Sequence, residues 1–303
     1  MGAASSTLFR ELWGEETLNS LKRKQKEVQR VFNGITDYTM KVKDVKSAGY
    51  HGPKFSGLSG ETVSRGNSFD SVQSADNSSI DIAFDQKSGG AYDIKLDQAG
   101  QTPVELAKEY GDEMAEEIMD EYDEYILTQL IGNCADANKV DFAGAGSNAD
   151  VITAADFIKA RKILNLAGAP QRGRYCFIDP KHESELYSIS NFVSRDKIAK
   201  TEALKEGVVG RLLGFDVILT TNMPQVDIAG DINATTAKND SYPVLFVQSL
   251  AYGWGRQKEF ATMQSNDAKA TTTDYSLWSM HGGALQEDDY ILQISDQTTA
   301  DPS

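Results

Sequence analysis

The stretch TPVELAKEYGDEMAEEIMDEYDEYILTQLIG, residues 102–132, predicts one long helix. Thr102 is a good N-cap, Pro103 suits the first helical position, and Glu105 completes a capping box. Gly132 suits the left-handed stop at the C-terminal end. At ~1.5 Å per residue these limits imply a rod of roughly 40 Å or more. Its apolar residues recur every three or four positions, which predicts one buried face and one charged face.

This helix carries far more acid than base. Between Glu105 and Glu124 its only base is Lys108, against ten acids: Glu105, Glu109, Asp112, Glu113, Glu116, Glu117, Asp120, Glu121, Asp123 and Glu124. Acids in the C-terminal half of a helix oppose its macrodipole, at about 0.3–1 kcal/mol each before salt screening. No Lys or Arg in the last turn offsets them. The pattern assigns the acids to the outer face of the helix.

The most basic part of the chain, residues 22–30, offers a partner for these acids. It contains Lys22, Arg23, Lys24, Lys26 and Arg30. We expect this segment to lie along the acidic helix of its own or a neighbouring chain, with Glu117, Glu121 and Glu124 among its contacts. A merely solvated acidic face is the alternative.

Composition excludes several function classes. The net charge of −15 argues against a protein that wraps nucleic acid, because phosphate binding needs surplus Lys and Arg. Only the basic segment leaves room for a nucleic-acid contact. Cys134 and Cys176 lack a metal-binding or disulfide spacing, and no apolar run is long enough to span a bilayer. The N-terminus does not resemble a secretory signal.

No motif in the chain rises to catalysis. Carboxylate-bridged metal sites on helices use Glu-x-x-His, and the long helix contains no His. The segment DFAGAGSNADV (141–151) approximates a dinucleotide fingerprint, but the helix after it begins too late to meet a pyrophosphate. HESE (182–185) lacks the second His of a zinc motif. We therefore expect no catalytic, cofactor-binding or metal-ligating residues, and a carboxylate-rich metal enzyme is the distant alternative.

The remaining chain reads as strands and an α/β segment. SIDIAFDQ (79–86) and AYDIKLDQ (91–98) alternate, and the intervening KSGG predicts a hairpin turn. Residues 49–79 are rich in Gly, Ser and Asn, which predicts either disorder or an extended loop held by another subunit. Beyond residue 150, Thr153 caps a helix and RYCFID (174–179), FDVILTTN (215–222) and VLFVQS (244–249) predict strands.

The order of these elements resembles the coat proteins of tailed bacteriophages. The most specific part is RYCFIDPKHESELYSISNFVSRDKIAKTEALKEGVVGRLLGFDVILTTNMP (174–224): a strand ending in Asp-Pro, a helix, an FVS segment, GVVGRLLGFDV and an Asn-x-Pro exit. The resemblance covers nearly the whole chain and implies the α+β, HK97-like capsid fold.

The resemblance also implies a domain layout. Residues 1–36 would be the N-terminal arm. Residues 37–149 would be a peripheral domain that includes the E-loop (about 46–79) and a spine helix (103–131). An axial α/β domain would occupy 150–245, and 246–303 would return to the peripheral domain. A separate scaffold, or none, is expected, because no long scaffolding segment precedes the arm.

The implied function is that of a major capsid protein, not an enzyme. Copies would assemble as pentamers and hexamers into an icosahedral shell around double-stranded DNA, without sequence-specific binding and without a membrane. Portal, scaffold and decoration proteins would be further partners, and the protein would reside in the virion after assembly in the bacterial cytoplasm. The E-loop would dock on another copy through Tyr50, Phe55 and Phe69. An encapsulin-type nanocompartment shell is the alternative within the same architecture.

Overall fold

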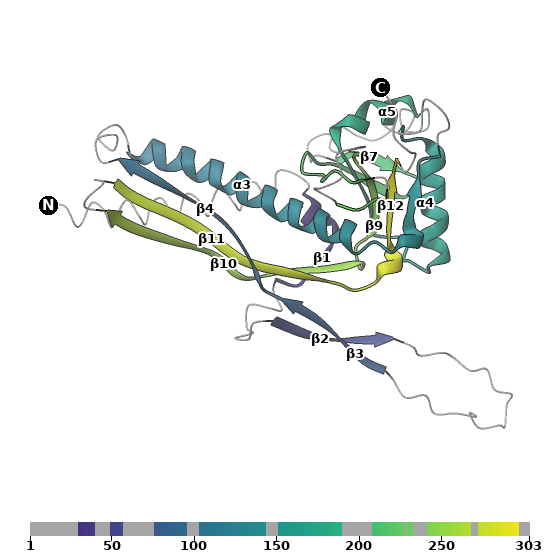
Figure 1. Cartoon of the computed structure of the whole chain (residues 1–303), viewed down its shortest axis with the longest axis horizontal. Coiled ribbons are helices and arrows are strands. Elements are labelled where there is room, and N and C mark those ends of the chain that lie inside the picture. The colour runs from purple at the N-terminus through teal and green to yellow at the C-terminus, as the bar shows by residue number, and fades with distance from the viewer. Residues whose placement is uncertain are drawn as a thin grey trace.

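The computed structural model contains one long helix, two main sheets and a projecting pair of strands (Figure 1). It describes residues 30–39, 49–56, 76–95, 103–143, 151–189, 208–227, 229–232, 241–267 and 272–296.

The long helix α3 spans Pro103–Gly132, close to the predicted range 103–131. Gly132 lies within the helix and lacks the left-handed backbone that the sequence predicted for it. It runs lengthwise over three long strands, and its C-terminal half reaches the second sheet (Figure 1). The face toward the sheets is apolar and fully buried, with the residues Ala115, Ile118, Met119, Tyr122, Ile126, Leu127, Leu130 and Ile131. The predicted apolar face is therefore confirmed over this part of the helix.

The strands beneath α3 form a four-stranded sheet, here called the long sheet. Its order is β1 (Thr36–Asp37), β10 (Tyr252–Asp267), β11 (Thr272–Leu285) and β4 (Gln86–Lys95). β10 and β11 are an antiparallel pair from Tyr252↔Leu285 to Asp267↔Thr272, and β1 joins β10 in parallel.

A six-stranded sheet, here called the central sheet, makes up the second body. Its order is β5 (Lys139–Asp141), β12 (Ile291–Ser295), β9 (Val244–Gln248), β6 (Arg174–Ile178), β8 (Phe215–Leu219) and β7 (Val208–Leu212). The predicted strands at 174–179, 215–222 and 244–249 are confirmed as β6, β8 and β9.

Side-chain alternation divides the central sheet between two cores. Leu245 and Val247 of β9 pack with α3, whereas Val244 and Phe246 face α4 (Ala154–Leu166) and α5 (Glu183–Ser188). Both faces are thus covered, and every residue of β9 and β12 is buried. The first core continues between α3 and the long sheet, so α3 joins the two sheets.

The predicted hairpin between residues 79 and 98 is wrong. β3 (Asp76–Ala83) pairs with β2 (Gly49–Ser56), while β4 pairs with β11 and contains the supposed turn residues 87–90. A Cβ atom at Gly89 would lie 2.2 Å from the carbonyl oxygen of Leu277. Glycine here allows close strand approach rather than a turn.

β2 and β3 form a separate two-stranded sheet that projects away from the two larger sheets (Figure 1). They are the described ends of the predicted E-loop, and residues 57–75 between them lie outside the described part of the chain. The paired ends show that at least these parts of the segment adopt strand structure.

Two predicted domain limits differ from the strand pairing. Residues 246–303 were assigned to the peripheral part, yet β12 lies in the central sheet between β5 and β9, and β5 itself belonged to the range 37–149. The reason is burial: Ile291, Leu292 and Ile294 are fully buried, which a strand achieves only inside a sheet covered on both faces.

Candidate functional site

The last residue of the basic segment lies on the long helix. Arg30 precedes the short 3-10 turn η1 (Val31–Gly34), which is anchored by buried Val31 and Phe32. Nη1 of Arg30 contacts the Asp120 carboxylate and lies 3.6 Å from Oδ2 of Asp123. Thus the root of the arm, residues 30–34, is held on α3 of its own chain.

Asp123 is the buried member of this group. Only 2 % of the residue is exposed, and its Oδ1 accepts the backbone N–H of Phe32 at 3.3 Å. Burial raises the pKa of Asp123 to about 7, although the charge of Arg30 and the backbone hydrogen bond act in the opposite direction. Asp123 therefore does not lie on the outer face, where the sequence analysis had assigned all the acids.

The other predicted acids occupy different positions. Glu117 and Glu124 are exposed and Glu121 is half-buried, so they form an acidic strip beside the Arg30 contact. Lys22, Arg23, Lys24 and Lys26 lie outside the described residues. Their predicted pairing with this strip stays a prediction.

The predicted E-loop anchors are only partly described. Tyr50 is half-buried against Tyr38 of its own chain, with ring centroids 5.6 Å apart. The side chain of Phe55 and all of Phe69 lie outside the described part. Tyr50 thus contributes to the base of the β2–β3 projection rather than presenting a free ring.

An aromatic cluster lies under the arm root, between α3 and the long sheet. Phe32 stacks on Trp254 with ring centroids 5.5 Å apart, and Tyr122 contacts Trp254 edge-on with ring centroids 5.4 Å apart. His281 packs against Tyr122 at 4.8 Å, and burial, aided by Arg256, lowers its pKa to about 4. Sequence analysis missed this cluster, because strand periodicity does not reveal which aromatic residues meet a helix.

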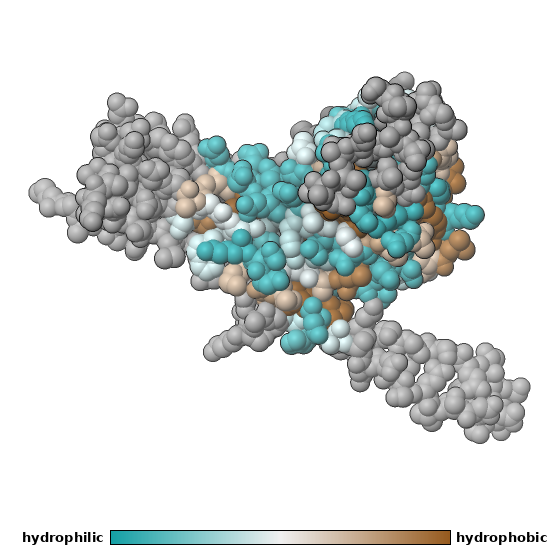
Figure 2. All heavy atoms as spheres, in the orientation of Figure 1, coloured by the Kyte–Doolittle hydropathy of each residue, from teal (hydrophilic) through white to brown (hydrophobic). Residues whose placement is uncertain are grey.

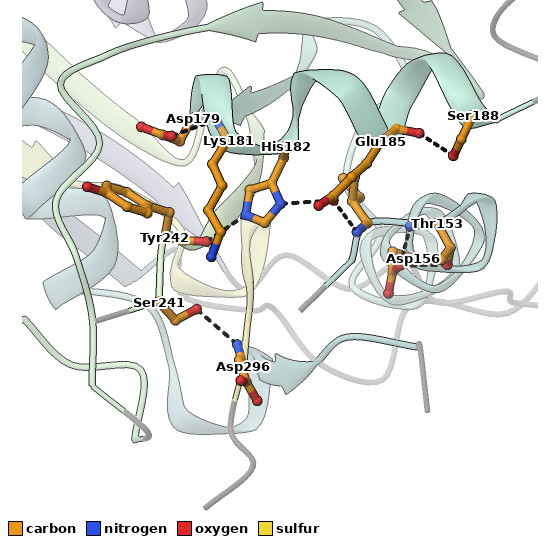
Figure 3. A network of polar contacts seen from close by, with 11 residues as sticks. Thr153, Asp156, Asp179, Lys181, His182, Glu185, Ser188, Ser241, Tyr242 and Asp296 are labelled. Atoms are coloured by element: carbon orange, nitrogen blue, oxygen red, sulfur yellow. Dashed lines mark hydrogen bonds and ion pairs between the residues drawn. The ribbon is translucent and has the colours of Figure 1, made fainter. Parts of the chain in front are cut away.

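A second polar group lies on the opposite side of the central sheet (Figure 3). Buried His182 has two acceptors: Nδ1 is 3.0 Å from Oε2 of Glu185, and Nε2 is 3.1 Å from the carbonyl oxygen of Tyr242. The same Glu185 oxygen accepts the backbone N–H of Ile152 at 2.7 Å. His182 and Glu185 together connect the start of α5 to the segments that contain Tyr242 and Ile152.

The start of α4 completes this network (Figure 3). Thr153 caps the helix as predicted and forms a capping box with Asp156, which also accepts the backbone N–H of Ala143 at 2.7 Å. Asp179 accepts from the backbone N–H of Lys181 at 2.8 Å, which confirms the predicted Asp-Pro helix start. These contacts fix backbone segments, and they account for HESE as a structural motif.

In the described ranges, no cluster of three or more His, Cys, Asp or Glu side chains is arranged to hold a metal ion. The glycines of the fingerprint-like segment, 144 and 146, lie outside those ranges. None of the helices described combines the length and hydropathy that crossing a bilayer requires.

Comparison with protein-family models matches residues 86–292 to the family described as phage capsid protein. The match contains α3, both sheets except β1 and the last residues of β12, and the His182 network. A comparison with curated proteins finds no match.

Solved structures agree with the family match. A structure from Mycobacterium phage Che8 has a TM-score of 0.63 and 18% identity, covering 89% of this chain and 93% of that one. The capsid of Ralstonia phage GP4 has a TM-score of 0.65 and 11% identity, covering 92% and 91%. A virus-like particle from Pyrococcus furiosus has a TM-score of 0.54 and 10% identity, covering 92% and 96%.

At these identities the structural likeness establishes the fold alone, and that fold is the predicted α+β, HK97-like capsid fold. The family match spans more than half of the sequence. The chain belongs to the phage capsid protein family, whose members are structural proteins of the virion shell.

Proposed function

We propose that this capsid shell protein is the major coat subunit of a tailed, double-stranded DNA bacteriophage. Copies would assemble through pentamers and hexamers into an icosahedral shell that encloses the genome, in the cytoplasm of the bacterial host. The observation that supports this most strongly is the extent of the structural match. The alignments with phage structures cover about nine tenths of this chain and about nine tenths of the phage chains. A structural role without catalysis is part of the proposal.

The charge of the chain supports a container for DNA. With a net charge of −15, the protein has no excess of bases with which to neutralise phosphates. A shell that bound its contents tightly would hinder packaging and release. The enclosed DNA would therefore be held by confinement rather than by sequence-specific contacts.

The arm root supports a role for the acidic strip. Arg30 fixes the arm on α3, and the bases at 22–26 precede it by only a few residues. We propose that they continue along an acidic strip, their own or a neighbour's. Reversing Glu117, Glu121 and Glu124 to Lys would then block assembly, and reversing the four upstream bases as well would partly restore it. If the variant with only these three Glu→Lys changes formed normal particles, the acidic strip would be merely solvated and would have no basic partner.

The E-loop proposal follows from the projecting strands. β2 and β3 project away from the two main sheets (Figure 1), and we propose that the segment between them contacts another copy. Phe55 and Phe69 remain the proposed anchors, since Tyr50 packs on Tyr38. Weak contacts of this kind, repeated over a closed symmetric shell, can give high total stability.

A nanocompartment shell is the second candidate, favoured by the similarity to the Pyrococcus furiosus particle. Electron microscopy of particles from the native source separates the two. The phage proposal predicts DNA inside and a portal at one vertex, with scaffold or decoration proteins as optional partners. Protein contents and identical vertices would contradict it.

A further inference from the structure

The outer face of α4 carries two apolar side chains in solvent. Ile158 is 59 % exposed and Leu166 is 79 % exposed, whereas Phe157, Ala160 and Leu164 of the same helix are fully buried. Figure 2 shows brown, hydrophobic surface at the right-hand edge, where Figure 1 draws α4. This helix therefore has an apolar strip that its own core does not use.

The strip is basic as well as apolar. Lys162 lies four residues from both Ile158 and Leu166, so the three side chains are neighbours on one helix face. Arg161 is exposed beside them. In the described part of the chain neither Arg161 nor Lys162 forms an ion pair. We call these four residues the α4 face.

Side-chain hydrogen bonds tie this helix to β6 and β5. At its C-terminal end, Arg174 of β6 donates to Oδ1 of Asn165 at 2.9 Å and to the carbonyl oxygen of Ala169 at 2.7 Å. Near its start, Lys159 donates to the carbonyl oxygen of Asp141 at 3.0 Å. The α4 face is thus presented by a fixed element, which lowers the ordering cost of binding.

We propose that the α4 face is a contact between copies of this chain, and that it binds an acidic surface of the second copy. The argument for a second copy is charge. On a chain with 45 acids and 30 bases, a basic strip is complementary in charge to the acidic surface of another copy. Two α4 faces placed against each other would oppose Arg161 and Lys162 to their counterparts.

The contact is therefore heterologous, with different surfaces on the two sides. Heterologous contacts generate rings when the rotation closes, whereas self-complementary contacts end at a dimer. A ring-forming contact is what a shell protein requires. This inference rests on the proposed assembly of the chain into a shell. It names one contact surface in that assembly and predicts that the contact is heterologous.

The test compares two double variants in the full-length protein. Ile158→Ser with Leu166→Ser removes the apolar part of the α4 face without touching the core. Leu250→Ser with Ile232→Ser is the matched control, since these side chains are 44 % and 41 % exposed elsewhere on the surface. Circular dichroism would verify folding, and light scattering with negative-stain microscopy would give the protein concentration needed for particles.

We expect the α4 double variant to raise that concentration by about ten-fold or more, because the contact recurs in every subunit. The control pair should leave it unchanged. Particles from the α4 variant at the wild-type concentration would overturn the inference while leaving the capsid function standing. Failure of the wild-type chain to form particles would instead contradict the proposed function.

A cross-linking experiment identifies the opposite surface. Both native cysteines are buried, so a photoreactive maleimide would label Leu166→Cys selectively. Mass spectrometry of irradiated particles should find cross-links between copies that join residue 166 to an acid-rich segment. Cross-links from residue 166 to the α4 helix of another copy, or only to its own chain, would overturn the proposal.

Discussion

The guanidinium of Arg30 lies 3.6 Å from the buried carboxylate of Asp123 and joins the arm root to the middle of α3. Asp120 contacts the same guanidinium from the exposed side. Phe32, whose backbone N–H donates to Asp123, stacks on Trp254 in the aromatic cluster. The arm is thus fastened at a point where the long helix, the long sheet and the central sheet share one core.

Removing the base should destabilise the subunit in a pH-dependent way. Arg30→Ala leaves the Asp123 carboxylate without its counter-charge, which costs about 3 kcal/mol when the carboxylate is ionised. We expect this loss in urea unfolding of unassembled protein at pH 8, and a smaller loss at pH 5. Exposed Glu124→Gln is the control and should change little. An equal loss at both pH values would contradict a buried, titrating Asp123.

Asp123 should also make the free energy of unfolding depend on pH in the wild-type protein. The unfolded chain ionises Asp near 3.8, whereas the pKa of Asp123 in the fold is raised to about 7. Between these values the folded protein holds a proton that the unfolded chain has lost. This stabilising contribution is complete at low pH and is lost as pH rises through about 7.

The isosteric variant Asp123→Asn isolates that contribution. Its unfolding free energy should fall less between pH 5 and pH 8 than that of the wild-type protein. Thermal unfolding of both proteins across this range measures the difference. Parallel curves would show that Asp123 has the same pKa in both states.

The close approach of β4 and β11 predicts a steric effect at Gly89. Gly89→Ala would place a Cβ atom 2.2 Å from the Leu277 carbonyl oxygen and 2.6 Å from Cα of Trp278, so the strands must separate. We expect a loss of about 3 kcal/mol, at the upper end of overpacking effects. Gly132→Ala, with no atom within 4 Å of its Cβ, should be neutral or slightly stabilising. A tolerant Gly89 in thermal unfolding would contradict the pairing of these strands.

The contacts of His182 predict that its loss destabilises the surrounding segments. His182→Ala removes the ring contact of the Tyr242 carbonyl oxygen and one of the two contacts of Glu185 Oε2, at about 1–3 kcal/mol. Hydrogen exchange at the Ile152 amide should accelerate, since that amide binds Glu185. Tyr187→Phe removes an exposed hydroxyl that donates to Glu183 at 3.3 Å, away from the His182 contacts, and serves as control. An unchanged exchange rate in His182→Ala would show that His182 does not stabilise the hydrogen bond of the Ile152 amide.

Much of the fold followed from local signals. The start of α3 followed from Pro103 and the start of α4 from Thr153 and Asp156, because such residues act through their immediate neighbours. The end of α3 was predicted nearly at the right residue, but the helix does not end through the predicted left-handed backbone at Gly132. Strand partners did not follow. Gly89 and Gly90 satisfy a turn pattern, yet their role is to admit β11 and Met114, which are distant in sequence.

The site was only half predictable. The basic segment and the acidic helix suggested their pairing, and Arg30 does contact α3. Asp123 was missed as the buried partner, although it lies four residues from both Met119 and Leu127 on the apolar face. An acid in the middle of an apolar stripe is the signal that could have found it, because such a position requires a partner.

Electron microscopy of the purified full-length protein, concentrated under assembly conditions, tests the central claim most directly. A shell subunit predicts closed particles of uniform size that contain many copies of the 33.1 kDa chain. Single molecules of that mass at every concentration, in a solution free of particles, would contradict it.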